Sequence, residues 1–218
     1  MAQASGPTAA LAGVPTGLQA QGLWIGRRQL FIRFAAEAET ATMYTAAAIA
    51  QELKRTAART LFHSIAIGGR DPLSNLEFLQ TALAHGPMPL PVMLDADGQR
   101  PEGVATLAKY LALVQITLEG ATMEPMAERA LESLKIAANA GVEHAIVLAP
   151  GDQTSDGQML RVVEQTHATS AKAAIIIHPP PNTPLDRDRR WVTLVERALP
   201  VHNDVRLFLR LPPPTGTR

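Results

Sequence analysis

The chain has 218 residues, of which 46% are hydrophobic and 18% are charged. Its 20 basic and 20 acidic residues cancel to a net charge of zero, which argues against a nucleic acid or an anionic membrane as the main partner. The sequence contains no cysteine, so disulfides and thiolate chemistry are excluded. The length and composition fit one compact domain, and the zero net charge gives little repulsion between copies or partner proteins.

The two ends of the chain are expected to lie outside the folded body. Residues 1–21 are rich in Ala, Gly, Pro and Thr and lack the basic region of a secretory signal, so we expect a flexible tail. Residues 211–218 contain three consecutive prolines, which can join neither a helix nor a sheet, and form a second expected tail. Between them, residues 22–210 contain no apolar run long enough to cross a membrane, and we expect a cytoplasmic protein.

Short apolar runs rich in β-branched residues alternate with helical patterns along this body. The predicted strands are residues 29–34, 62–67, 91–94, 114–118, 145–148, 173–177 and 205–209. The predicted helices are residues 45–60, 75–85, 101–111, 125–140, 155–169 and 186–199. This alternation is typical of βα units and a parallel sheet. It favours an α/β fold of the partial (βα)₆, TIM-like barrel type, although periodicity alone leaves a doubly wound sheet open.

The first half of the body resembles a known family. Residues 26–36 are similar to the first barrel strand of radical S-adenosylmethionine enzymes, and most of all to the short 7-carboxy-7-deazaguanine synthases. Further similarities follow in order: residues 64–73 resemble the second strand and its GGEP loop, residues 91–98 the third strand and its acid-Thr-Asn-Gly loop, and residues 114–120 the fourth strand. The resemblance covers about residues 22–120 and implies a partial barrel of the same type.

In that family a CxxxCxxC motif after the first strand holds an iron–sulfur cluster. The three cysteine positions fall here on Glu37, Ala41 and Tyr44. Alanine and tyrosine cannot replace thiolates on such a cluster, and the Glu37 carboxylate is a hard donor where soft sulfur is needed. The family also has an Asp after the third cysteine, where this chain has Thr45, which is more simply the N-cap of the next helix. The resemblance therefore implies a barrel that has lost its cluster, and we expect no cofactor.

The loop after the second predicted strand keeps part of the family's pattern. Gly68 and Gly69 stand where the family cradles the amino group of S-adenosylmethionine, but Arg70 and Asp71 replace the glutamate. Free backbone N–H groups beside an arginine could hold an anion, which leaves residual cofactor binding open. Alternatively, the glycines only let the strand turn sharply into the loop.

Other chemistry-bearing residues follow the later strands. Asp95 and Asp97 follow the third strand, Glu119 the fourth and His178 the sixth. Active sites of barrels collect at the carboxyl ends of the strands, so these side chains could hold a divalent cation or act as general acid and base. The competing interpretation is structural: Asp97 and Gly98 form a turn, and His178 is a strand-end residue bonded to backbone.

Three hypotheses about function follow. The first, which we favour, is a degenerate radical-SAM-like pseudoenzyme that serves as a non-catalytic binding or scaffold subunit, pairing with an active enzyme or presenting a substrate. Its expected partner is a protein or a second copy, with a small molecule left open and no nucleic acid or membrane. The second is a barrel enzyme repurposed for metal-dependent or acid–base chemistry at Asp95, Asp97, Glu119 and His178. The third, deliberate replacement of the cysteines in a working enzyme, is opposed by the three different replacement residues.

Overall fold

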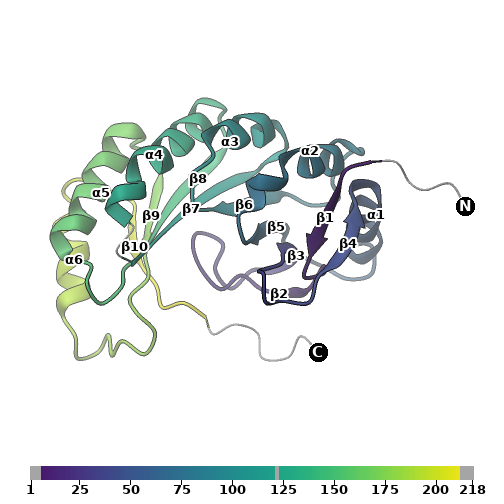
Figure 1. Cartoon of the computed structure of the whole chain (residues 1–218). Coiled ribbons are helices and arrows are strands. Elements are labelled where there is room, and N and C mark those ends of the chain that lie inside the picture. The colour runs from purple at the N-terminus through teal and green to yellow at the C-terminus, as the bar shows by residue number, and fades with distance from the viewer. Residues whose placement is uncertain (1–5, 121–122, 212–218) are drawn as a thin grey trace, which may run out of the picture.

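The computed structural model describes residues 6–120 and 123–211. Within them, a ten-stranded sheet has the order β10-β9-β8-β7-β6-β5-β3-β1-β4, and β2 pairs with β3 (Figure 1). The parallel strands are β3 (Arg28–Phe34), β5 (Ser64–Gly69), β6 (Val92–Ala96), β7 (Leu113–Glu119), β8 (Glu143–Ala149), β9 (Ala174–Ile177) and β10 (Val205–Leu207). Antiparallel strands β1 (Thr8–Leu11), β2 (Thr16–Leu18) and β4 (Thr42–Thr45) extend the β3 side of the sheet.

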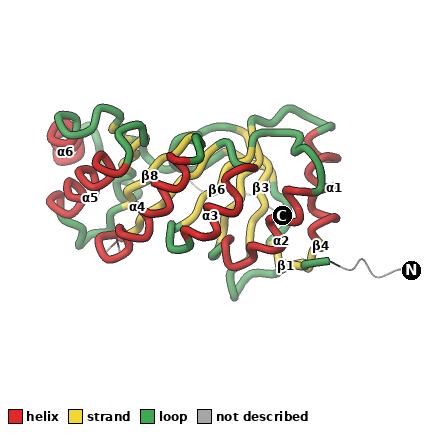
Figure 2. Tube along the Cα trace, turned by 90° about the horizontal axis from the view of Figure 1, so that it is seen from above, coloured by secondary structure: helices red, strands yellow, loops and turns green. Residues whose placement is uncertain are grey.

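Helices connect the parallel strands and cover the convex side of the curved sheet (Figures 1 and 2). They are α1 (Ala46–Ala57), α2 (Leu76–Ala84), α3 (Pro101–Leu107), α4 (Met123–Asn139), α5 (Asp156–Thr169) and α6 (Arg190–Ala198), with short 3₁₀ turns at Pro72–Asn75 and Ala108–Tyr110. The parallel strands follow one another in chain order, whereas a doubly wound sheet reverses its order and carries helices on both faces. The prediction of a partial barrel is therefore confirmed, and the sheet stays open between its edge strands β4 and β10.

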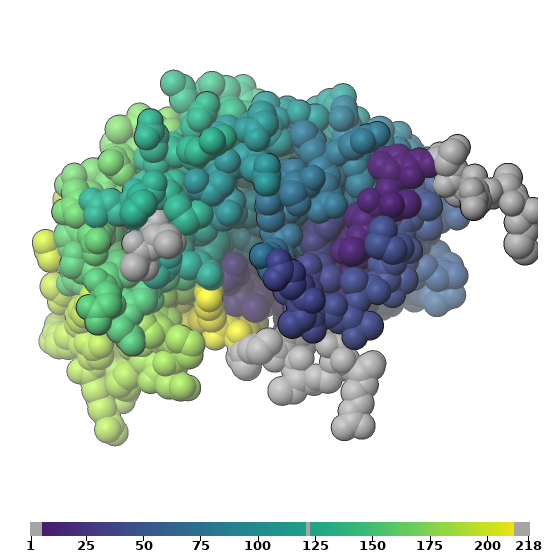
Figure 3. All heavy atoms as spheres, in the orientation of Figure 1, coloured from purple at the N-terminus to yellow at the C-terminus, as the bar shows by residue number. Residues whose placement is uncertain are grey.

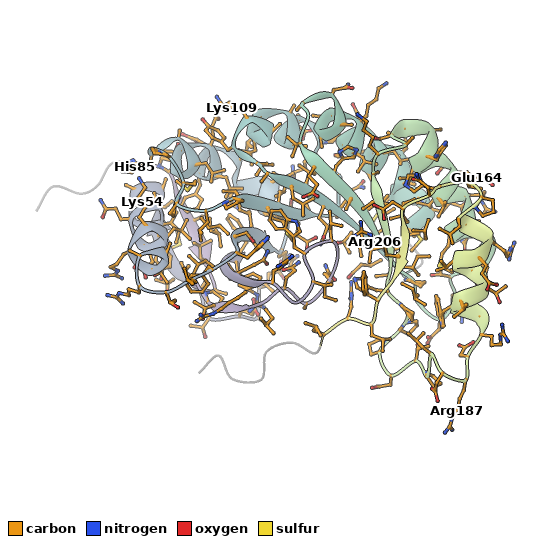
Figure 4. The ribbon with its side chains drawn as sticks, turned by 180° about the vertical axis from the view of Figure 1, so that it is seen from behind. Lys54, His85, Lys109, Glu164, Arg187 and Arg206 are labelled. Atoms are coloured by element: carbon orange, nitrogen blue, oxygen red, sulfur yellow. The ribbon has the colours of Figure 1, made fainter. Side chains whose placement is uncertain are left out.

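The helices are amphipathic, which places the main core between them and the sheet. In α6, Trp191, Leu194 and Ala198 are buried, while the charged side chains of the helical layer point outward. Figure 4 shows Lys54 on α1 beside His85 at the end of α2, where the lysine ammonium lies 3.4 Å from the His85 carbonyl oxygen. Within residues 6–120 and 123–211, no helix is long and apolar enough to cross a membrane.

The local start signals of two helices act as the sequence indicates. The Thr45 hydroxyl accepts a hydrogen bond from the Ala48 N–H at 3.2 Å, which confirms Thr45 as an N-cap. Ser155 begins α5 in a capping box with Gln158. The last predicted helix starts later than expected, at Arg190 rather than residue 186, because residues 184–188 form a turn in which the Asp188 N–H bonds to the Pro184 carbonyl at 2.8 Å.

The N-terminal segment departs from the expectation of a flexible tail. Ala9 and Leu11 on β1 are buried, and β1 lies between β3 and β4. The alternation of exposed and buried residues along β1 is the pattern of a strand with one buried face, which the abundant Gly and Pro around it obscure. At the other end, the Leu211 N–H donates to the Ala20 carbonyl at 2.9 Å. The remainder of the second expected tail, residues 212–218, lies outside the described residues.

Candidate functional site

A segment of the chain itself fills the concave side of the sheet. This segment, residues 19–27, connects β2 to β3 and is here called the plug; Figure 1 shows it reaching across the open side of the barrel. Its apolar side chains Leu23 and Trp24 pack on a small core on the concave face, which is formed by Met93, Leu113, Ala145, Val147, Ala174 and Ile176. The Trp24 ring also meets the His63 ring edge to face, with centroids 4.8 Å apart. Barrel enzymes place their reaction site at the carboxyl ends of the strands. Gln21 and Gly22 of the plug reach Asp95 and His178 at that end, whereas Trp24 lies beside His63 at the amino end of β5.

Two buried side chains bind the backbone of the plug. The Gly22 N–H donates to His178 Nε2 at 2.8 Å, and the Leu23 N–H donates to Gln115 Oε1 at 2.9 Å. Both acceptors lie on the sheet and are almost fully buried. A hydrogen bond made away from water is costly to leave unpaired, so these two bonds fix the plug at one register. The space-filling view shows the C-terminal residues, in yellow, beside the plug, in purple (Figure 3), in agreement with the Leu211 to Ala20 bond.

His178 uses both ring nitrogens in this arrangement. Because Nε2 accepts from Gly22, the ring proton belongs on Nδ1, which lies 2.7 Å from the Phe208 carbonyl oxygen and donates to it. Burial lowers the pKa of His178, the bond to Phe208 opposes this effect, and the charge of Arg210 adds to it. The interpretation of His178 as a strand-end residue bonded to backbone is confirmed, since neither nitrogen is left for a metal or a substrate proton.

Asp95 is the polar centre of the concave face. Its carboxylate accepts from the Thr117 hydroxyl at 2.9 Å and from the Gln21 amide of the plug at 3.1 Å. Burial raises the pKa of Asp95, and the hydrogen bonds from Gln21, Thr117 and Gln115 partly offset this effect. The charge of Arg210 opposes the rise as well, and with a pKa that is still raised Asp95 is a weaker acid than an exposed aspartate.

Several predicted site residues do meet around one cavity. A cavity of about 340 Å³ lies beside Gln21 and is lined by Asp71, Asp95, Asp97 and Glu119. His178 does not line it, and instead borders a smaller hollow of about 180 Å³ together with Glu119 and Arg210. The structure therefore brings the four carboxylates together and places the histidine beside only one of them, Glu119.

Arginine side chains pair with the carboxylates around these cavities. Asp71 accepts two hydrogen bonds from Arg100, at 2.8 and 2.6 Å, and these lower the pKa of Asp71. Glu119 lies 2.8 Å from Arg210. Among residues 6–120 and 123–211, no three His, Asp or Glu side chains lie close enough together to hold a metal ion. The hypothesis of a divalent cation therefore lacks a ligand set in the part of the chain that the structure describes.

Asp97 and Gly98 form the expected turn. Asp97 Oδ1 accepts from the Gln99 N–H at 2.9 Å, and Gly98 has a φ of +75°. A Cβ atom on Gly98 would lie 2.7 Å from Cα of Ala130 on α4. The turn interpretation is confirmed, and Gly98 also allows the close approach of α4.

The glycine loop serves the packing of two strands. Gly69 has a φ of +97°, and a Cβ atom there would lie 2.8 Å from the backbone nitrogen of Phe34 on β3. Gly68 precedes it on β5, and Arg70 forms an ion pair with Glu37 at 3.0 Å. Asp71 itself has a φ of 38°, so the chain turns sharply after the strand. These contacts account for Gly69 without an anion, and residual cofactor binding stays a prediction.

The three positions aligned with cluster cysteines do not converge. Glu37 and Ala41 lie in the loop after β3, whereas Tyr44 lies on β4 and pairs with Ala9 of β1. A short strand, β4, therefore stands between this loop and α1. Nearby, Glu39 forms an ion pair with Arg33, and the Ala36 N–H is the main cause that lowers the pKa of Glu39.

Sequence reasoning missed the residues that hold the plug. Gln115 stands in the middle of an otherwise apolar strand, and a buried amide there requires a partner on the concave face. The polar residue in this apolar strand is visible in the sequence. The partner of Gln115, the backbone of residues 22 and 23, follows only from the topology. Gly22 carries no local signal for its close approach to Gln115.

The fold and the plug together define an open α/β barrel whose concave side is filled by its own chain. No protein-family model matches the sequence, and no curated protein matches it either.

Proposed function

We propose that this protein is a non-catalytic binding or scaffold subunit, related to radical S-adenosylmethionine barrels, that pairs with an active enzyme or presents a substrate to it. The observation that carries the proposal is the plug, because its residues Gln21 and Gly22 bind Asp95 and His178 at the carboxyl ends of β6 and β9, the end at which a barrel enzyme binds its reactants. Loss of the cysteines at Glu37, Ala41 and Tyr44 supports the same conclusion from the chemistry of the cluster.

The first experiment is anaerobic reconstitution with iron and sulfide. We expect no stoichiometric iron in the protein and no 5′-deoxyadenosine after addition of S-adenosylmethionine and a reductant. A variant with Glu37→Cys, Ala41→Cys and Tyr44→Cys serves as a comparison, because it supplies three thiolates on the same backbone. Stoichiometric iron in the unmodified protein would overturn the proposal.

The second experiment tests the partner. The protein is co-expressed with a CxxxCxxC barrel enzyme from the same organism, and the mixture is resolved by size exclusion with light scattering. We expect one complex, and a higher turnover of the enzyme than in its isolated form. Separate elution together with an unchanged turnover would contradict the subunit role.

A second candidate function is acid–base catalysis at the cavity beside Gln21. Asp95 favours it, since burial raises the pKa of this carboxyl group and so favours the protonated form that can donate a proton. This candidate requires that Asp95→Asn abolish an activity that Asp186→Asn, in an exposed turn, leaves intact.

A further inference from the structure

The plug depends on a hydrogen bond that only a neutral histidine can accept. His178 Nε2 receives the Gly22 N–H, and its Nδ1 proton is committed to Phe208. When the ring is protonated, Nε2 also carries a proton, and two donors face each other at an almost fully buried side chain. An unpaired buried donor is costly, and here two are created at once.

We propose that the plug is a pH-gated cover over the concave face of the sheet, with His178 as its latch. The neutral imidazole keeps the plug docked, and the imidazolium releases it. This device is independent of whether the chain binds a partner enzyme, because it concerns only contacts within the chain.

The charged groups around His178 determine the direction of the gate. Arg210, in the segment after β10, lies close enough to disfavour a second positive charge, and Glu119 at the end of β7 is paired with that arginine. The ends of β8 and β9 line the same hollow with Ala149, glycine and prolines, and the plug offers uncharged Gln21 and Gly22. Burial comes first among the causes that lower the pKa of His178. A group with a lowered folded-state pKa stabilises the docked state above about pH 6.5, and this contribution is lost as the pH falls through the folded-state pKa.

The other polar anchor of the plug responds to acid differently. Asp95 accepts from Gln21, and a protonated carboxyl group still offers an oxygen as acceptor. Burial raises the pKa of Asp95, so the folded protein prefers its neutral form as the pH falls. Acid therefore weakens the anchor at His178 and leaves the one at Asp95 in place. Substitutions at these two residues can thus be compared in one test, with Asp95 as the control.

Release of the plug uncovers an apolar surface. The side chains beneath Leu23 and Trp24 come from β6, β7, β8 and β9, and they include Met93, Val147 and Ile176. While it is docked, the plug therefore shields this apolar patch from water.

The first test follows the fluorescence of Trp24. The chain has two tryptophans, so Trp191→Phe leaves Trp24 as the only emitter. Between about pH 7.5 and 5, spanning the ordinary histidine range, we expect a red shift of the emission with unchanged far-ultraviolet circular dichroism. His178→Gln should remove the pH dependence, whichever position the plug then adopts.

Two controls separate the latch from its neighbours. His63 touches Trp24 and could quench it on protonation, so His63→Gln must keep the red shift. Asp95→Asn must keep it as well. A red shift that persists in His178→Gln, or an emission that stays constant until the circular dichroism is lost, would overturn the proposal.

The absence of cysteine allows a second test that does not alter His178. Leu23→Cys and Leu61→Cys each place one thiol in the chain, the first on the side of the plug that packs on the small core and the second at a residue that is 90% exposed. Dividing the two labelling rates at each pH cancels the loss of thiolate in acid. We expect the ratio of position 23 to position 61 to rise at least tenfold from neutral to acid pH; a constant ratio contradicts the gate.

Discussion

Gly22 shows how one absent side chain allows the plug to dock. Its φ is +77°, and a Cβ atom there would overlap the amide group of Gln115, the same group that accepts from Leu23. Gly26, in the same plug, has the same φ of +77° but has nothing within 4 Å of its Cβ position. The two glycines therefore share the backbone requirement and differ only in the contact.

We predict that Gly22→Ala destabilises the protein more than Gly26→Ala does. Both pay the cost of a side chain at positive φ, about 1–2 kcal/mol. Gly22→Ala also displaces Gln115 and breaks its buried bond, for about a further 1–3 kcal/mol. Urea unfolding at neutral pH measures the difference, and equal losses would show that the contact with Gln115 is unimportant.

Asp95 provides a prediction with a defined dependence on pH. Burial raises its folded-state pKa, so the stability that its neutral form gives is fully present below the unfolded pKa of about 3.9 and is lost as the pH rises through the folded-state pKa. Asp95→Asn should therefore unfold at higher urea than the wild type at neutral pH, with the advantage disappearing in acid. Asparagine can keep the bonds to Thr117 and Gln21 if the Gln21 amide turns over. If Asp95→Asn were more stable than the wild type by the same amount at neutral and at acid pH, the raised pKa of Asp95 would be contradicted.

Residue patterns predicted roles that are satisfied within a short stretch of chain. Thr45 as a cap and Asp97 as a turn residue depend on neighbours two or three positions away, and both were predicted correctly. The role of Gln115 depends on a residue 92 positions away, which no local pattern contains.

At the scale of elements, the cap of α5 can be tested directly. The Ser155 hydroxyl accepts from the Gln158 N–H at 3.2 Å, and the Gln158 side chain returns the contact to the Ser155 N–H at 2.8 Å. Ser155→Ala should cost about 1 kcal/mol, whereas Ser155→Gly should cost only a few tenths. Thermal unfolding compares the two variants, and a reversed order would show that the capping box contributes little.

The strands that were predicted and those that were missed differ in where their partners come from. β9 is buried along its whole length, as a central parallel strand must be, and its apolar run is therefore visible in the sequence. β1, β2 and β4 are three or four residues long and half exposed, and they are held by antiparallel pairing at the β3 side of the sheet. Their stability comes from that pairing, so their sequences carry little sign of it.

For the whole molecule, the continuous core predicts cooperative unfolding. One core cluster runs between sheet and helices from Ala9 to Val205, and the small core beneath the plug lies on the opposite face of the same strands. Trp24 and Trp191 report from the concave face and from α6 respectively. Trp24→Phe and Trp191→Phe each leave one tryptophan as the emitter. In each variant at neutral pH, we expect the urea transition seen by fluorescence to have the same midpoint as the transition seen by circular dichroism. An earlier transition at Trp24 alone would show that the plug is loosely held even when His178 is neutral.

The hydrogen bond between Gly22 and His178 joins residues 156 positions apart. A ribosome therefore completes the plug long before it makes the strand that latches it. The βα units can assemble in order as they emerge, each strand beside the previous one, but Leu23 and Trp24 have no complete surface to cover until β9 has been synthesised. An apolar segment near the start of the chain thus lacks part of its contact surface until a strand near the end of the chain has been made.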